Sequence, residues 1–184
     1  VEMSSFTFPK ILHLYWDLSV FSYLNLLTIE SLNRYHDGWE IYIHTPKNPN
    51  QKINWSSFEH KLRLTGKSYF ERLKSYPNVK FFEVDFDSFF NINFLKDASE
   101  IVKSDYLRYH LLVEYGGIWS DFDILYINNI EDLLNFTASN VIFHCSIKET
   151  NGSVDYYPIG FFAAEKGSKL FRYILKQCEN FYNK

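Results

Sequence analysis

Apolar and polar positions in the first part of the chain follow two patterns, which predict a strand, a helix and a second strand. A short apolar run at residues 11–16 follows Pro9 and predicts a buried strand. Residues 21–35 carry apolar side chains near helical spacing, and the segment 36–38 ends that pattern. Residues 39–45 alternate between apolar and polar side chains, as a half-buried strand does. This order opens a βαβ unit with a right-handed crossover.

Strands and helices continue to alternate along the rest of the chain. The sequence predicts a loop at 46–54, a helix at 56–76 with a weak point at Gly66, a strand at 79–84, a helix at 105–115, a strand at 118–123 that continues extended through 124–127, a short helix at 130–134, strands at 140–147 and 156–164 around a turn at 148–153, and a helix at 167–182. Asn151-Gly152 in the turn is a hairpin signal. We therefore expect one α/β domain over residues 1–184, with a Rossmann-type, mostly parallel central sheet flanked by helices.

The segment 103–126 carries the chemistry of the chain. Ser104 suits the N-cap of its helix, and Asp105 suits the positive first turn. Gly116-Gly117 predicts the end of the helix, because glycine accepts the left-handed conformation found there. The chain then enters the strand that carries Asp121-Phe122-Asp123.

Asp121 and Asp123 point to the same side if this stretch is extended, and Phe122 points to the other. Two carboxylates aimed at one point repel each other unless a cation lies between them. Hard oxygen ligands suit Mg²⁺ or Mn²⁺, and such ions keep positions for substrate phosphates. The pair therefore predicts a divalent metal that holds a diphosphate.

This segment resembles a known family. Lys-Ser-Asp-Tyr-Leu-Arg from Lys103, followed by Tyr-Gly-Gly-Ile-Trp-Ser-Asp-Phe-Asp from Tyr115, is similar to the DXD sugar-binding region of a glycosyltransferase group. The group includes initiating mannosyltransferases of the Golgi, capsular polysaccharide transferases and glucosylating domains of bacterial toxins. The resemblance implies a GT-A-like nucleotide-sugar binding fold. Members of the group usually continue past the final helix, so we expect a short member or a fragment.

The resemblance also implies roles for four residues. Asp105 and Arg108 would face the donor sugar and its phosphates. Asp121 would reach ribose or sugar hydroxyls, and Asp123 would bind Mn²⁺ or Mg²⁺ with Asp121 beside it. Asp121, Asp123 and Arg108 are the candidate catalytic residues. The alternative for Asp105 and Arg108 is a surface pair one helical turn apart, worth a few tenths of a kcal/mol.

Two tryptophans are candidate donor contacts. A Pro-Lys-Ile-x-His segment ending in Trp16 resembles the family's opening, and by that match Trp16 stacks on the nucleotide base. A core Trp capping the sheet is the alternative. Trp119 stands where relatives place an aromatic residue near the sugar or base, and core packing is equally plausible. We interpret His13 as a hydrogen-bonded core histidine, and most of the other aromatic residues as core.

Other polar residues of the chain have structural interpretations. Asp85-Phe86-Asp87 is a second Asp-x-Asp, but it lacks the helix and the glycine pair, and Asp is common in turns and helix caps. We expect it to be a turn without metal. Lys103 is more simply a solvated side chain than a phosphate ligand.

Composition limits the possible partners. The 184 residues are 46% apolar and 22% charged, with a net charge of −3, which is typical of a globular protein and disfavours nucleic acid. No apolar run is long enough for a transmembrane helix, and no signal peptide is evident. Cys145 and Cys178 allow one disulfide and imply no oxidising compartment. A cytoplasmic location is favoured; a secretory lumen remains open because glycosylation patterns occur at Asn54, Asn135 and Asn151.

The sequence therefore predicts a metal-dependent glycosyltransferase. It would move a sugar from a nucleotide sugar, UDP-linked in preference to GDP-linked, to a glycan or protein acceptor, and the resemblance implies retention of configuration. One alternative is a non-catalytic module that binds nucleotide sugars or glycans. Another is a phosphohydrolase with Asp121 as nucleophile and Asp123 as acid, although that class places its Asp-x-Asp after the first strand. Release of nucleoside diphosphate together with free sugar distinguishes the first reading.

Overall fold

The computed structural model describes residues 8–50, 66–88, 93–131, 134, 141–143, 146–148 and 150–182. Its central sheet runs in the order β3-β2-β1-β4-β8-β5. The strands of this sheet are β1 (Ile11–Tyr15), β2 (Glu40–Pro46), β3 (Val79–Val84), β4 (Gly117–Ser120), β5 (Val141–Phe143) and β8 (Phe161–Ala164). A separate hairpin pairs β6 (Ser146–Ile147) with β7 (Val154–Tyr156). The helices are α1 (Tyr23–Tyr35), the 3₁₀ helix η1 (Phe70–Ser75), α3 (Asn93–Asp97), α4 (Glu100–Glu114) and α6 (Lys169–Tyr182).

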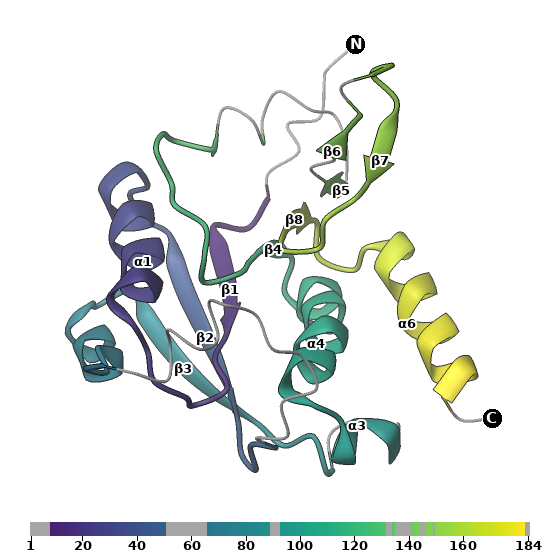
Figure 1. The fold of residues 1–184 in the computed structure, drawn as a ribbon, viewed down its shortest axis with the longest axis horizontal. Helices are drawn as coiled ribbons and strands as arrows, with labels where there is room; N and C mark the ends of the chain where they lie inside the picture. Colours follow the sequence, from purple (N-terminus) through teal and green to yellow (C-terminus); the bar gives the residue numbers. More distant parts are fainter. Residues whose placement is uncertain are drawn as a thin grey trace.

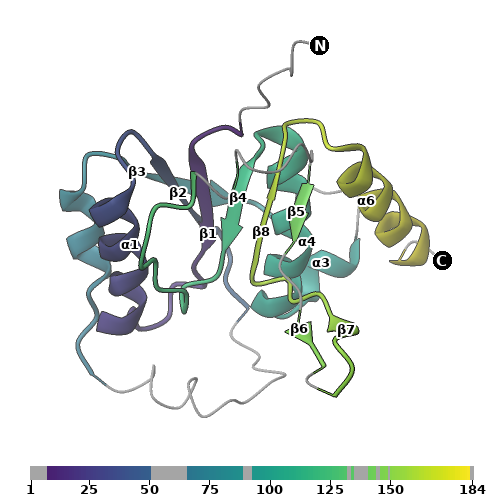
Figure 2. The same ribbon diagram turned by 90° about the horizontal axis from the view of Figure 1, so that it is seen from above.

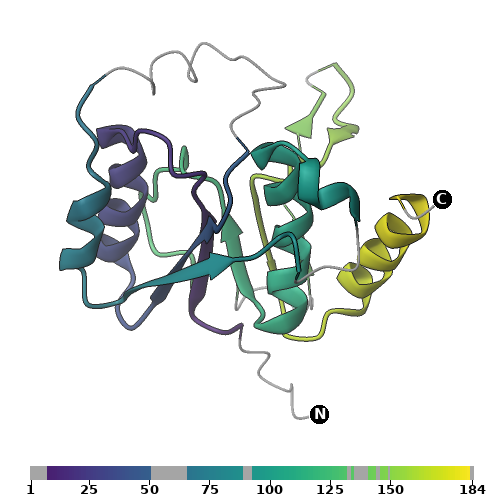
Figure 3. The same ribbon diagram turned by 90° about the horizontal axis from the view of Figure 1, so that it is seen from below.

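The sheet is mostly parallel, as predicted. β3, β2, β1 and β4 run parallel, and β8 runs antiparallel to both β4 and β5. Figure 1 shows the sheet between α1 on one side and α4 on the other. Figure 2 shows the strands side by side, and Figure 3 shows α6 lying beyond α4 at the end of the molecule. No helix in the described ranges is long and apolar enough to cross a bilayer.

Each face of the sheet has its own core, because side chains alternate along each strand. Leu12 and Leu14 of β1 belong to the α1 side, whereas Tyr15 packs on the α4 side. The α1 side combines residues of the strands with residues of the helix: Leu26, Ile29, Leu32, Ile41, Ile43, Ile118 and Ala163. The α4 side also mixes aliphatic and aromatic residues, among them Leu107, Leu111, Trp119, Phe162, Ala164, Phe171 and Leu175. The interpretation of many aromatic residues as core is confirmed.

The predicted start of the central helix is wrong. α4 begins at Glu100, and Ser99 is its N-cap, with Oγ accepting a hydrogen bond from the N–H of Val102. Ser104 therefore lies one turn inside the helix, and Asp105 is not in its first turn. Ser99 and Ser104 are both suitable N-cap residues, but only Ser99 is preceded by non-helical backbone. The predicted end is confirmed, since the glycines that follow α4 both have positive φ.

Several other boundaries differ from the sequence prediction. Of the predicted helix at 56–76, the described part contains only the 3₁₀ helix η1. The single strands expected at 140–147 and 156–164 are each divided. The Asn151-Gly152 turn pairs β6 with β7 as a hairpin, and Pro158 separates β7 from β8 because proline cannot donate in a ladder. The patterns at Asn54 and Asn135, Cys145, and most of the remainder of the 56–76 helix lie outside the described residues.

The two glycines after α4 lie against neighbouring backbone. A Cβ on Gly117 would lie 2.5 Å from the carbonyl oxygen of Ile11, and one on Gly116 would lie 2.5 Å from the backbone nitrogen of Lys166. His13 Nε2–H donates to the carbonyl of Gly116 at 3.0 Å, so its Nδ1 accepts from His44 Nε2–H at 3.1 Å. His13 is fully buried, which confirms the expectation of a hydrogen-bonded core histidine. β1 and the start of β4 are therefore held in one register.

We expect Gly117→Ala to destabilise the fold much more than Gly38→Ala. Both glycines have positive φ, which costs an L-residue about 1–2 kcal/mol. A Cβ at Gly38 meets nothing within 4 Å, whereas at Gly117 it overlaps backbone, which adds about 1–3 kcal/mol. Urea unfolding of the two variants measures the difference. Equal losses of unfolding free energy would show that Gly117 is needed only for its φ angle.

The buried histidines should make the fold sensitive to acid. Burial lowers the pKa of His13 from 6.5 to about 4, and burial also lowers the pKa of His44. Well above pH 6.5 both histidines are neutral whether the chain is folded or not. Between pH 6.5 and about 4 only the unfolded chain takes up the proton, so the free energy of unfolding falls by up to about 1.4 kcal/mol per pH unit for each group. Denaturation at pH 7.5, 6 and 5 should show this slope, and His13→Asn should reduce it; an unchanged slope contradicts the assignment.

Candidate functional site

The site lies at the edge of the sheet where the parallel strands end, and it joins α4 to the segment after β4. Asp105 and Arg108 lie one turn apart on α4, and Asp121 follows the last residue of β4. Arg108 Nη2 lies 2.7 Å from Asp105 Oδ1, and Arg108 Nη1 lies 3.7 Å from Asp121 Oδ1. The sequence-predicted helix face therefore lies beside the first Asp of the motif.

Arg108 is buried, with only 4% of its surface exposed. Its Nε donates to the carbonyl of Ser104 at 3.3 Å, its Nη2 to Ser104 Oγ at 3.2 Å, and its Nη1 to the carbonyl of Ile159. The guanidinium carbon lies 4.8 Å from the centre of the Trp119 ring, within the range of a cation–π contact. The alternative of a solvated surface pair is wrong for Arg108, because its guanidinium is held by protein groups on several sides.

Asp121 is fixed by both backbone and side chain. Its N–H donates to the carbonyl of Gly160 at 2.8 Å, and its Oδ1 accepts from Trp119 Nε1–H at 3.0 Å. A Cβ on Gly160 would lie 2.8 Å from Asp121 Oδ2. The turn before β8 therefore covers one side of this carboxylate, while 41% of the side chain stays exposed.

The sequence predicted an extended strand through residues 121–123, and this prediction is wrong. β4 ends at Ser120, and Phe122 and Asp123 form a turn. Phe122 is buried, with its ring edge-on to Trp16 at 5.5 Å and to Phe21 at 5.0 Å. The apolar core on the α1 side thus anchors the middle of the motif, and Asp123 stays exposed.

The site has an excess of negative charge. Burial raises the pKa of Asp121, Arg108 and the Trp119 N–H oppose this shift, and the carboxylates of Asp123 and Asp105 add to it. Burial also raises the pKa of Asp105, again against the effect of Arg108. The carboxylates of Asp123 and Asp105 thus both act on Asp121, and Arg108 offsets them. Their oxygen donors are those that Mg²⁺ and Mn²⁺ prefer.

The described residues contain no group of three or more potential ligands arranged around one point. A site of one or two carboxylates suits Mg²⁺, which commonly completes its shell with water and substrate phosphates. The donor set therefore fits an ion that is held jointly by the protein and a diphosphate.

Both candidate tryptophans are buried. Trp16 is 4% exposed, and its Nε1–H donates to the carbonyl of Ser19 at 3.0 Å. This is the packing described by the core alternative, and stacking of a base on Trp16 would require neighbouring side chains to move. Trp119 is 1% exposed and contacts the site through Arg108 and Asp121. Direct contact of either ring with a donor stays a prediction.

The second Asp-x-Asp is a turn, as expected. The N–H of Asp87 donates to Asp85 Oδ1 at 3.0 Å, which closes the turn locally. Lys47 Nζ lies 2.9 Å from Asp85 Oδ2, and the Asn48 amide donates to Asp87 Oδ2 at 3.0 Å. Each of these carboxylates thus has a partner on the segment after β2.

The expectation that Lys103 is solvated is wrong. Its side chain is 2% exposed and pairs with Glu100 Oε1 at 2.9 Å. Glu100 also accepts from the Tyr15 hydroxyl and from the N–H of Asn50. A helical i, i+3 pair is visible in the sequence, but its burial depends on partners from β1 and the segment after β2, which are distant along the chain.

Other supporting groups were missed by the sequence reading. The carbonyls of Ile159 and Gly160 contact Arg108 and Asp121, and a backbone carbonyl carries no sequence signal. The Trp119 N–H is the exception, because a residue two positions before Asp121 on a strand points to the same side.

The family of the chain follows from its sequence. Residues 24–140 match the model of the glycosyltransferase sugar-binding region containing the DXD motif, a stretch that includes all of α4 and β4 and all but the first residue of α1. The match covers more than half of the chain, and the chain belongs to this family of glycosyltransferases. No curated protein sequence matches it.

Solved structures share the fold. The PaToxG glycosyltransferase has a TM-score of 0.54 at 16% identity, over 96% of this chain and 61% of that one. The glycosyltransferase GlyE of Streptococcus pneumoniae TIGR4 has a TM-score of 0.54 at 11% identity, over 97% of this chain and 39% of that one. A transferase solved as a double cysteine mutant gives 0.57 at 11% identity, over 100% and 81%. The GT-A-like fold is therefore confirmed, and the chain spans about three-fifths of PaToxG and two-fifths of GlyE.

Arg108→Lys should lower the rate of nucleotide-sugar hydrolysis by more than about tenfold. An ammonium group lacks the planar fork that reaches two carboxylates and two carbonyls, and each lost charged hydrogen bond is worth about 1.5–3 kcal/mol. Asp105→Asn should also slow turnover. Arg72→Lys is the matched control, because Arg72 lies 2.9 Å from Glu30 but is 54% exposed.

Steady-state hydrolysis and thermal unfolding of these variants measure the effect. Near-normal rates in both Arg108→Lys and Asp105→Asn would remove the α4 pair from the site.

Proposed function

We propose that the chain is the donor-binding catalytic domain of a metal-dependent glycosyltransferase. It transfers a sugar from a nucleotide sugar, with UDP favoured over GDP on family resemblance, to a hydroxyl of a glycan or protein. The observation that carries the proposal is the junction at which buried Arg108 contacts Asp105 at 2.7 Å and Asp121 at 3.7 Å. This junction couples the family's helix to the DXD motif.

Asp123 and Asp121 are the residues that would hold Mn²⁺ or Mg²⁺. When bound, such an ion stabilises negative charge on a departing diphosphate. Asp123 is the more exposed of the two, and Asp121 shares its carboxylate with Trp119 and Arg108. Asp123 is therefore the better placed ligand, and the exposed part of the Asp121 carboxylate can accept hydrogen bonds from ribose or sugar hydroxyls.

Asp105 and Arg108 bind and orient the donor in this proposal. Asp105 keeps 41% of its side chain exposed beside the guanidinium, so it can accept hydrogen bonds from sugar hydroxyls. Arg108 fixes the carboxylate geometry and supplies positive charge next to the phosphates. Because these groups are held before the donor arrives, little reorganisation accompanies the reaction.

The transfer step forms one bond and breaks one. The acceptor hydroxyl oxygen bonds to the anomeric carbon, and the bond from that carbon to the diphosphate oxygen breaks with its electron pair on the diphosphate. The hydroxyl proton passes to the departing diphosphate. Attack from the side that the diphosphate leaves retains the configuration, as the family resemblance implies.

Hydrolysis of a panel of nucleotide sugars with Mn²⁺ tests the proposal, because water replaces the acceptor and both nucleoside diphosphate and free sugar are released. Asp123→Asn should abolish the metal-dependent rate. Asp87→Asn is the matched control and should leave the rate nearly unchanged, since Asp87 belongs to a closed turn.

The reverse ranking would move the metal site to the Asp85 turn. Calorimetric binding of a nucleotide sugar without any turnover would identify the chain as a binding module. Release of phosphate from a simple phosphomonoester would favour the phosphohydrolase.

A further inference from the structure

The segment that precedes β8 lies against the site. Phe161, the first residue of β8, pairs with Ser120, the last residue of β4. The segment before Phe161 therefore reaches the sheet at the carboxyl end of β4. Figure 2 shows the β6–β7 hairpin projecting from this edge of the sheet. The carbonyls of Ile159 and Gly160 accept hydrogen bonds from Arg108 and Asp121. The segment that joins the hairpin to β8 is thus hydrogen-bonded to the guanidinium of Arg108 and to the backbone of Asp121.

Tyr157 stands between the hairpin and these two carbonyls, and 58% of its surface is exposed. Its ring is not loose, because it packs edge-on to Phe143 with centroids 6.1 Å apart. Phe143 in turn packs on Phe162 at 5.6 Å, in the same core as Trp119. Tyr157 therefore lies on the face of the sheet that carries Arg108. Its ring contacts Phe143, and more than half of its surface is exposed to solvent.

The hairpin next to Tyr157 carries several polar side chains, and its one lysine lies near an aspartate. Lys148 Nζ lies 3.5 Å from Asp155 Oδ1, which pairs the charges of its two strands. Asn151 Oδ1 accepts from the N–H and hydroxyl of Ser153 in the turn. An anionic ligand would find no unpaired cation among these side chains. A sugar ring suits them, because its apolar C–H face packs on an aromatic ring while the tyrosine hydroxyl can hydrogen-bond.

We propose that Tyr157 forms an acceptor subsite for a neutral saccharide. The inference rests on the proposed function, which requires a hydroxyl to approach the anomeric carbon beside Asp121. Tyr157 stands three residues before Gly160 in the sequence, and the Gly160 carbonyl accepts a hydrogen bond from the Asp121 N–H, so a saccharide stacked on Tyr157 would lie at the same end of β8 as the site. Its hydroxyl oxygen bonds to the anomeric carbon, the diphosphate leaves with the electron pair, and the hydroxyl proton passes to the diphosphate.

The test measures how the donor sugar divides between water and an acceptor. The protein is incubated with Mn²⁺, the nucleotide sugar that it hydrolyses fastest, and the methyl glycosides of glucose, galactose, mannose and N-acetylglucosamine. Mass spectrometry gives the ratio of disaccharide to free sugar. Tyr157→Ala should lower this ratio roughly tenfold, and Tyr157→Phe should keep most of it, because the stacking ring remains.

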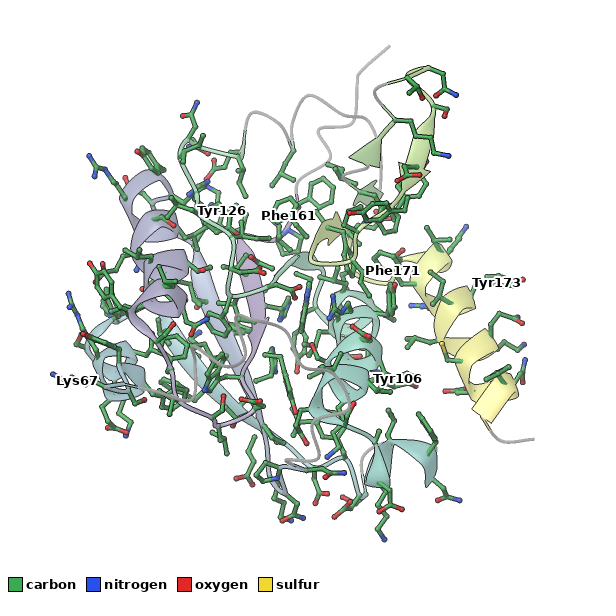
Figure 4. The ribbon with its side chains drawn as sticks, in the orientation of Figure 1. Lys67, Tyr106, Tyr126, Phe161, Phe171 and Tyr173 are labelled. Atoms are coloured by element: carbon green, nitrogen blue, oxygen red, sulfur yellow. The ribbon has the colours of Figure 1, made fainter. Side chains whose placement is uncertain are left out.

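Tyr173→Ala is the matched control. Tyr173 is 62% exposed on α6, and Figure 4 shows its side chain pointing away from the body of the molecule. This variant should keep the wild-type ratio. An unchanged ratio in Tyr157→Ala, or an equal loss in Tyr173→Ala, overturns the proposal.

A binding measurement separates the subsite from turnover. Saturation-transfer NMR should detect a methyl glycoside on the wild type and on Tyr173→Ala, and lose the signal on Tyr157→Ala. No signal on the wild type, or equal signals on all three proteins, contradicts the subsite. Failure to release nucleoside diphosphate in any sample instead contradicts the proposed function, whatever the NMR shows.

Discussion

The buried guanidinium of Arg108 is the constraint on which the site depends. A charged group taken out of water costs several kcal/mol unless it is paired and hydrogen-bonded. Arg108 meets this cost with the carboxylate of Asp105, the carbonyls of Ser104 and Ile159, and the ring of Trp119. These partners come from α4, β4 and the segment before β8, so satisfying one side chain fixes three parts of the chain relative to each other.

The spacing of the family motif follows from the geometry of this junction. Eight residues of helix separate Arg108 from Gly116, a rise of about 12 Å. Four residues of strand separate Gly117 from Asp121, a rise of about 13 Å. The chain therefore runs along α4, reverses direction at two glycines that pack against the backbone of Ile11 and Lys166, and runs back along β4 over a similar distance, so that Asp121 lies beside Arg108. A change in the number of residues between Arg108 and Gly116, or between Gly117 and Asp121, would separate the guanidinium from Asp121.

Features encoded over short distances were predictable from the sequence. The apolar pattern of each strand, the glycine stop after α4 and the Asn151-Gly152 hairpin each depend on neighbouring residues. The failures depend on distant ones. Lys103 is buried because Glu100 collects donors from Tyr15 and Asn50, and neither is near in sequence. Residues 121–123 turn because Phe122 is drawn into the core against Phe21, whereas the local pattern favoured an extended chain. The sequence motif names the candidate residues, but it gives no sign of the carbonyls that contact Arg108 and Asp121.

The same distant contacts explain how an electrostatically unfavourable site can exist before its ligand binds. Burial raises the pKa of Asp121, and the nearby carboxylates of Asp123 and Asp105 raise it further, so the negative charges oppose the folded arrangement. Arg108 and the Trp119 N–H offset these effects. The burial of Phe122 and the close backbone packing at Gly116 and Gly117 stabilise the fold against this repulsion. Neither contact depends on a cation. A cation with a diphosphate would therefore meet carboxylates already in place, and its binding would relieve their repulsion without first ordering the chain.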